Sequence, residues 1–118
     1  MPSSRDERLY LQDIVEAVDA VARFVAELER ETFAGNDLVR SAVLHKLQVI
    51  GEAAAHLGEE TRRASPQVPW VAVVGFRNYT VHAYFAVDWD IVWTTATVDA
   101  PTIGDAVRAL LVTMPVPG

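Results

Sequence analysis

Residues that could carry out chemistry are concentrated in one short segment around position 80. Arg77 is the single lysine or arginine between Ala64 and Val107, and His82 follows it in the same segment. An arginine supplies a permanent positive charge and a planar fork that suits phosphate oxygens. Histidine is the side chain whose ordinary pKa permits proton transfer near neutral pH. The pair could therefore bind a phosphodiester and move the protons needed to break it.

Asn78 and Tyr84 extend this candidate site. Asn78 precedes His82 by about one helical turn, so its amide could support the imidazole or contact the same ligand. Tyr84 falls on the helical face of Arg77, whereas Arg77 and His82 lie about 140° apart on an ideal helix. One helix would need the length of the arginine side chain, or a neighbouring chain, to bring the two together. We expect a homodimer in which the same helix from two subunits completes the site around a two-fold axis.

Each of these residues also has a purely structural interpretation. An arginine can end an apolar helix facing solvent, and a histidine can be a half-buried core residue. For the other two histidines, His45 and His56, we identify no carboxylate at metal-ligand spacing and expect structural or surface positions. We accordingly expect no metal ion and no cofactor.

The overall charge limits the kind of nucleic-acid contact that this chain can make. Its 118 residues include 10 Lys and Arg against 16 Asp and Glu, a net charge of −6, and no cysteine. That balance argues against an extended basic coat for nucleic acid but allows a local basic site. The start lacks the apolar core of a signal peptide, and the apolar stretches are shorter than the roughly 20 residues of a spanning helix. We expect one cytoplasmic domain over 1–118 without membrane contact, with frayed ends at 1–4 and 114–118.

Hydrophobic periodicity predicts helices throughout the first half of the chain. The first expected helix begins at Ser4, where Glu7 follows at capping-box spacing, and the sequence Gly35-Asn36-Asp37 stops it. The second covers about Asp37 to Glu60. Gly51 lies inside this second helix at a cost of about 1 kcal/mol relative to alanine. Such a glycine is typical of a point where another helix backbone packs closely.

The second half predicts three further helices. Pro69 could begin a helix that covers Trp70 to about Phe85. Its β-branched and aromatic residues would also permit a strand, but the lack of two-residue alternation favours a helix. Asp88 can cap a fourth helix, and Pro101 interrupts the chain and starts a short final one. The fold class that we expect is all-α, an antiparallel bundle of four long helices plus a short C-terminal helix.

The candidate site residues also carry a family resemblance. Residues 77–84 read R-N-x3-H-x-Y, a form of the Arg-x4-His-x-Tyr motif of HEPN-domain ribonucleases. Five further stretches resemble the HepT-like branch of that superfamily. They are Tyr10-Leu11-Gln12-Asp13-Ile14, Ile50-Gly51-Glu52-Ala53, Pro69-Trp70, Tyr84-Phe85, and Val87-Asp88 with Ile91-Val92-Trp93. The resemblance extends over nearly the whole chain, from about residue 5 to residue 111.

The resemblance implies a toxin of a two-gene toxin–antitoxin module, with a small nucleotidyltransferase as the antitoxin. Members of the family are homodimeric all-α bundles that cut RNA without metal in a cleft shared by the two motif helices. Arg77 and His82 match the catalytic arginine and histidine, and Asn78 matches the polar residue after the arginine. Tyr84 matches the tyrosine that the antitoxin modifies with AMP. Thr80 differs from the usual family residue, as does Ala83, which puts the substrate preference in question.

Two other classes of function stay open. The domain could be a non-catalytic nucleotide-binding module, or a structural partner of the nucleotidyltransferase. The acidic net charge argues against efficient binding of a large RNA away from Arg77. A small or locally docked RNA, or a basic partner protein, would suit that surface better.

Overall fold

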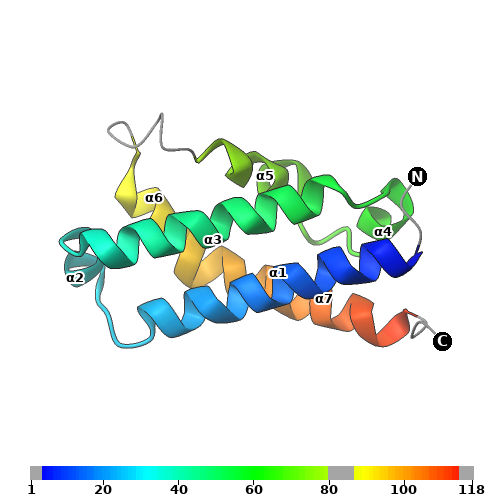
Figure 1. The fold of residues 1–118 in the computed structure, drawn as a ribbon, viewed down its shortest axis with the longest axis horizontal. Helices are drawn as coiled ribbons and strands as arrows, with labels where there is room; N and C mark the ends of the chain where they lie inside the picture. Colours follow the sequence, from blue (N-terminus) through cyan, green and yellow to red (C-terminus); the bar gives the residue numbers. More distant parts are fainter. Residues whose placement is uncertain (1–3, 80–86, 115–118) are drawn as a thin grey trace.

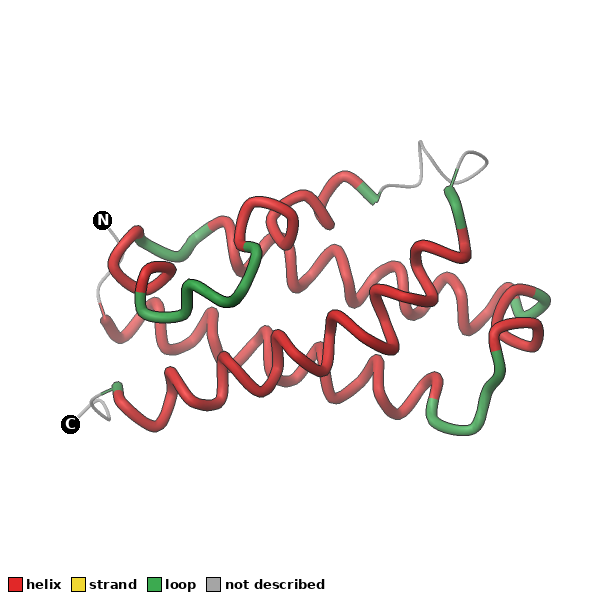
Figure 2. Tube along the Cα trace, turned by 180° about the vertical axis from the view of Figure 1, so that it is seen from behind, coloured by secondary structure: helices red, strands yellow, loops and turns green. Residues whose placement is uncertain are grey.

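Residues 4–79 and 87–114 are described by the computed structural model, and within these ranges the regular structure is entirely helical, with no strand (Figure 2). The predicted all-α fold class is therefore confirmed for this part of the chain. His82 and Tyr84 lie outside the described residues. None of the helices within the described ranges combines the length and the apolar character needed to cross a membrane.

The two longest helices lie side by side. Helix α1 (Ser4–Val25) packs along α3 (Asp37–Ala55), and Figure 1 shows them running in opposite directions. A short helix, α2 (Arg30–Ala34), connects them and contributes the buried Phe33. The first helix thus ends before the stop predicted at Gly35-Asn36-Asp37, and Gly35 instead ends α2.

Helix α3 also ends earlier than predicted. It stops at Ala55, and a separate helix α4 (Glu59–Arg63) follows a short connection. The Glu7 carboxylate of α1 accepts hydrogen bonds from the Gly58 N–H and the Thr61 hydroxyl, both at 2.6 Å. The start of α4 is therefore held by a side chain from a distant helix. The spacing of apolar residues around Gly58 does not indicate this contact with Glu7, so it could not be predicted from the local sequence.

The segment that carries the candidate site departs most from the prediction. Helix α5 (Trp70–Val74) gives way to a 3₁₀ helix, η1 (Gly75–Asn78), and Tyr79 has φ −75° and ψ 74°, outside the helical region. The expected helix over residues 70–85 is thus wrong at Tyr79. Trp70 is fixed by hydrogen bonds from its indole N–H to the Arg62 carbonyl of α4 and to the Ser65 carbonyl of the connection that follows, each at 3.0 Å.

The last part of the described chain forms one continuous helical run. It comprises α6 (Trp89–Thr94), a π-helical turn η3 (Thr95–Asp99) and α7 (Ala100–Thr113). The Asp88 side chain caps α6 by accepting from two backbone N–H groups, as predicted. The predicted start of the last helix at Pro101 is confirmed to within one residue, because α7 begins at Ala100 with Pro101 in its first turn. At 14 residues this helix is not the short one predicted, and the predicted break before it is wrong, because the helical run is continuous. We attribute this to the π turn, whose wider backbone reduces the clash that a proline ring makes with the preceding turn.

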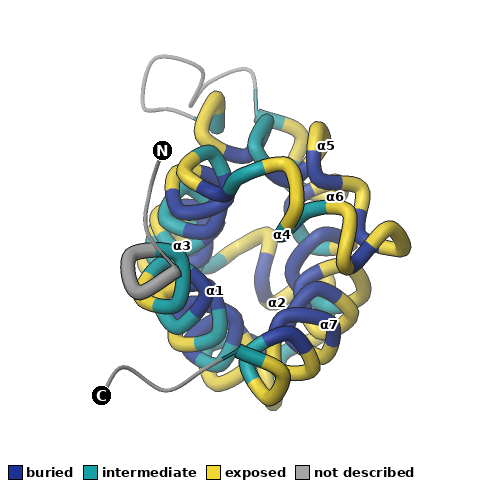
Figure 3. Tube along the Cα trace, turned by 90° about the vertical axis from the view of Figure 1, so that its right-hand side faces the viewer, coloured by how far each residue is buried: buried dark blue, intermediate teal, exposed yellow. Residues whose placement is uncertain are grey.

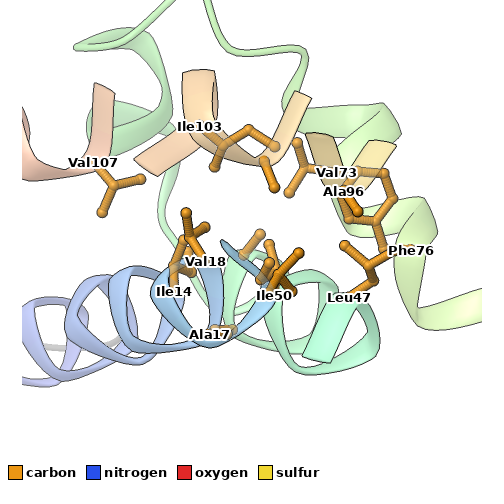
Figure 4. Packing of buried hydrophobic residues seen from close by; sticks show 14 of the residues in the cluster. Ile14, Ala17, Val18, Leu47, Ile50, Val73, Phe76, Ala96, Ile103 and Val107 are labelled. Atoms are coloured by element: carbon orange, nitrogen blue, oxygen red, sulfur yellow. The ribbon is translucent and has the colours of Figure 1, made fainter. Parts of the chain in front are cut away.

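The apolar core lies between α1, α3 and the α6–α7 run. Figure 3 shows the buried residues on the inward faces of these helices, and Figure 4 shows side chains from several elements meeting in one interior. Helix α7 approaches α1 closely, because a methyl group at Gly104 would lie 2.7 Å from a Val18 methyl carbon. The core members labelled in Figure 4 are Ile14, Ala17, Val18, Leu47, Ile50, Val73, Phe76, Ala96, Ile103 and Val107.

Candidate active site

The described half of the predicted site lies on η1, which packs against α3. Arg77 and Asn78 are both exposed at the end of this turn. Phe76, the residue before Arg77, is buried and belongs to the apolar core (Figure 4). The predicted pairing of Arg77 with His82 and the role of Tyr84 stay predictions. The angle of about 140° that an ideal helix would place between Arg77 and His82 does not apply, because the backbone leaves the helix at Tyr79. That angle therefore no longer supports the expected homodimer.

Gly51 of α3 sets the position of the Arg77 backbone. A Cβ atom at residue 51 would lie 2.6 Å from the Arg77 nitrogen, 3.0 Å from the Val73 carbonyl oxygen and 3.1 Å from the Phe76 Cβ. The close approach predicted from Gly51 is therefore confirmed, and its partner is the turn that carries the candidate site. A side chain at position 51 would push that turn away from α3.

Two further contacts attach the end of η1 to the bundle. The Gln48 side-chain amide of α3 donates to the Tyr79 carbonyl oxygen. The Tyr79 ring stacks on Phe76, with ring centroids 5.6 Å apart and an interplanar angle of 27°. Helix α3 therefore contacts η1 before, at and after Arg77, so the position of the arginine depends on tertiary packing.

The Arg77 guanidinium pairs with a carboxylate from α3. Its Nη2 lies 3.2 Å from Oε2 of Glu52, and the two side chains are 46% and 55% exposed. Solvent reaches both partners, so the pair is not a buried structural bridge. Glu52 was not a candidate site residue, although it follows Gly51 in a stretch that carries the family resemblance. Because Glu52 and Arg77 are far apart in the sequence, no local pattern indicates that they pair.

Glu52 also contacts His56, one helical turn later. The second carboxylate oxygen, Oε1, lies 3.5 Å from His56 Nε2. The His56 ring stacks on Tyr10 of α1, with centroids 4.6 Å apart and planes 9° from parallel. The expectation that His56 has no suitably spaced carboxylate is wrong, because Glu52 lies four residues before it. The surface position expected for His56 is confirmed, since its side chain is 48% exposed.

These residues surround a shallow cavity of about 180 Å³ between α1 and α3. Its lining comprises Tyr10, Asp13, Val49, Glu52, Ala53 and His56. A larger cavity, of about 310 Å³, lies between α5 and α7 and is lined mainly by apolar residues that include Val73 and Ile103. Arg77 does not line that larger cavity. Among the described residues, no group of three or more histidine and carboxylate side chains is arranged to hold a metal ion.

Similarity to known proteins places this chain in a family. The model of the ribonuclease HepT-like family matches residues 14–110, and the chain belongs to that family. It is 36% identical over 101 residues to "Putative RNase MJ1380" of Methanocaldococcus jannaschii, an alignment that covers 86% of this chain and 93% of the relative. It is 33% identical over 99 residues to "Probable ribonuclease HepT" of Thermococcus cleftensis, with coverage of 84% and 90%.

A third relative also has a ribonuclease name. "Putative RNase TTE0752" of Caldanaerobacter subterraneus is 30% identical over 104 residues, with 88% of this chain and 93% of the relative aligned. No solved structure matches this chain. The match of the family model and the identities to these relatives confirm the family resemblance inferred from the motif.

Proposed function

We propose that this chain is a metal-independent endoribonuclease and the toxin of a toxin–antitoxin module. The supporting observation is that α3 holds Arg77, a rare cation in this half of the chain, at the surface of η1. Its relatives are named as ribonucleases, and a ribonuclease needs a charge that stabilises a phosphate in the transition state. The proposed catalytic residues are Arg77 and His82, with Asn78 supporting them.

The proposed reaction is an attack by RNA on its own backbone. His82 removes the proton from a ribose 2′-hydroxyl, and the 2′-oxygen forms a bond to the adjacent phosphorus. The bond from phosphorus to the 5′-oxygen breaks, and that oxygen leaves after receiving a proton from an imidazole. The products are a 2′,3′-cyclic phosphate and a 5′-hydroxyl. Arg77 neutralises the charge that grows on the phosphoryl oxygens, and the imidazole supplies general acid–base catalysis.

We propose that the active unit is a homodimer. The two subunits would place their motif segments on either side of one cleft, so that Arg77 of one chain and His82 of the other reach the same phosphodiester. A shared cleft also concentrates the two arginines. Local positive charge of this kind would offset the acidic net charge of the chain where the RNA binds.

We propose that a nucleotidyltransferase antitoxin silences the enzyme by transferring AMP from ATP to the Tyr84 hydroxyl, with release of pyrophosphate. Tyr84 is two residues from His82, so the modification would bring bulk and negative charge close to the proposed catalytic imidazole. Both effects would exclude a substrate phosphate.

A second function is favoured by the charge distribution. The net charge is −6, and the Arg77 guanidinium is already paired with Glu52. Both observations suit a structural partner of a nucleotidyltransferase, in which no RNA is cut; a non-catalytic nucleotide-binding module is the other alternative.

Cleavage of RNA by the purified protein separates the two functions. We expect the wild-type protein to cut RNA in the presence of a chelator and to leave 2′,3′-cyclic phosphate ends. Arg77→Ala should remove most of this activity. Arg63→Ala is the matched control, because it removes another exposed arginine that pairs with a glutamate, at 3.0 Å, away from the site. A protein that leaves RNA intact at all concentrations would favour the second function.

A further inference from the structure

Glu52 touches both Arg77 and His56, and we propose that it is a positioning residue for the Arg77 guanidinium. In this proposal, Glu52 orients the guanidinium toward a substrate phosphate, while His56 and Tyr10 keep Glu52 itself in place. The inference rests on the proposed ribonuclease function, because it assigns Arg77 to the phosphate. It adds a role for three residues that lie outside the Arg-x4-His-x-Tyr motif.

The backbone of Arg77 is held against α3 beside Glu52. Gly51 and Glu52 are consecutive residues of α3, and Gly51 brings the Arg77 nitrogen against that helix. The backbone positions of Arg77 and Glu52 are therefore fixed relative to each other. Only the long arginine side chain is left to be ordered.

The Arg77 side chain is restrained by its ion pair with Glu52. A half-exposed arginine has many accessible rotamers, and a phosphate can be stabilised well in only a few of them. The Glu52 carboxylate lies 3.2 Å from Nη2, so it restrains one edge of the planar guanidinium. A guanidinium has five N–H donors, so one that is restrained at a single edge retains donors for two phosphate oxygens.

Glu52 itself contacts a second side chain, His56. Its second oxygen lies 3.5 Å from His56 Nε2, and the His56 ring is stacked on Tyr10 of α1. The side chains of Tyr10, His56, Glu52 and Arg77 thus form a continuous row from α1 across α3 to η1. The stacking of His56 on Tyr10 favours the side-chain orientation of His56 that places Nε2 beside Glu52.

The opposite role for Glu52 makes a different prediction. A carboxylate beside Arg77 could compete with the RNA phosphate and inhibit the enzyme, in which case removing its charge would raise the rate. A positioning residue that acts mainly in the transition state has the reverse effect. Its loss lowers kcat, while KM stays the same or falls because one negative charge near the RNA has gone.

The experiment compares Glu52→Gln with Glu59→Gln in RNA cleavage. Glu59→Gln is the matched control, because it also removes one negative charge and one exposed arginine–glutamate pair, at 3.0 Å on α4. We expect Glu52→Gln to lower kcat about tenfold without raising KM. The control should match the wild type. In an Arg77→Ala background, Glu52→Gln should have no further effect. A rise in kcat, or equal effects of the two variants, would overturn the proposal.

A second measurement is independent of cleavage. NMR order parameters of the Arg77 Nε–Hε group, recorded without RNA, report directly how strongly the guanidinium is restrained. We expect a clear fall in Glu52→Gln and none in Glu59→Gln, with an unchanged fold in both. An unchanged order parameter in Glu52→Gln would overturn the positioning role. A wild-type protein without ribonuclease activity would overturn the proposed function instead, while this measurement would still decide whether Glu52 restrains Arg77.

Discussion

The backbone nitrogen of Arg77 lies so close to Gly51 that a methyl group at residue 51 would be 2.6 Å away from it. Because the atom met is a backbone atom, no side-chain rotation could relieve the contact. The glycine in the middle of α3 and the arginine of η1 therefore form one structural unit. This unit connects the stability of the bundle with the geometry of the candidate site.

Gly51→Ala should destabilise the fold and displace η1. The expected cost of overpacking is about 1–3 kcal/mol, and the gain in helix propensity is about 1 kcal/mol, so the net destabilisation is up to about 2 kcal/mol. Urea unfolding would measure the stability, and amide chemical shifts around Arg77 would report the displacement. Gly75→Ala is the control, because a Cβ there meets no atom within 4 Å. Equal stability of Gly51→Ala and Gly75→Ala would contradict the packing argument.

His82→Ala should remove most RNA cleavage while leaving the helical content intact. General acid–base catalysis typically contributes about 10²–10⁴-fold, so the rate should fall by a factor in that range. The rate is measured on a labelled RNA, and circular dichroism checks the fold. His45→Ala, at a histidine outside the motif, is the control. Cleavage by His82→Ala at the wild-type rate would exclude His82 as the acid–base residue.

Mixing two inactive variants tests the shared cleft. Arg77→Ala and His82→Ala subunits are each expected to be inactive as homodimers. In a mixed dimer, one site would contain both substitutions and the other would contain neither, if each site takes its arginine and histidine from different chains. We therefore expect partial recovery of cleavage after subunit exchange, measured against unmixed samples. No recovery from a verified mixed dimer would show that both residues of a site come from one chain.

Co-expression with the cognate nucleotidyltransferase should add one or more AMP masses to the protein at Tyr84. Intact-mass and peptide mass spectrometry would measure the gain, and Tyr84→Phe should prevent it. Tyr10→Phe serves as the control, since Tyr10 lies on α1 far from Tyr84 in the sequence. A silenced complex in which Tyr84 is unmodified would indicate inhibition by occlusion alone.

Glu7→Ala should lower stability without any direct effect on the candidate site. The Glu7 carboxylate accepts two hydrogen bonds, at 2.6 Å each, that hold the start of α4. Loss of such a cap typically costs about 1–2 kcal/mol, which urea unfolding can resolve. Glu16→Ala, at an exposed position of the same helix, is the control and should have little effect. A Glu7→Ala protein as stable as this control would show that the contact contributes nothing.

Sequence patterns predicted the features of this protein that depend on neighbouring residues. The spacing of apolar residues predicted the all-α fold class, Asp88 predicted the cap of α6, and Gly51 predicted a close backbone approach. The order of motif residues indicated the family. Helix periodicity and capping are local signals, because they are properties of a few adjacent positions. Gly51 indicated that another backbone packs closely against its helix, but it did not indicate that the partner is Arg77.

Only the tertiary structure decided where the helices end and which side chains meet. Packing against α3 converts the segment after Val74 into a 3₁₀ turn, and a π turn lets the last helix continue through Pro101. Glu52 meets Arg77, and Tyr10 meets His56, across elements that are distant in the sequence. Each of these outcomes depends on the free energy of burying one element against another, which no single stretch of sequence contains.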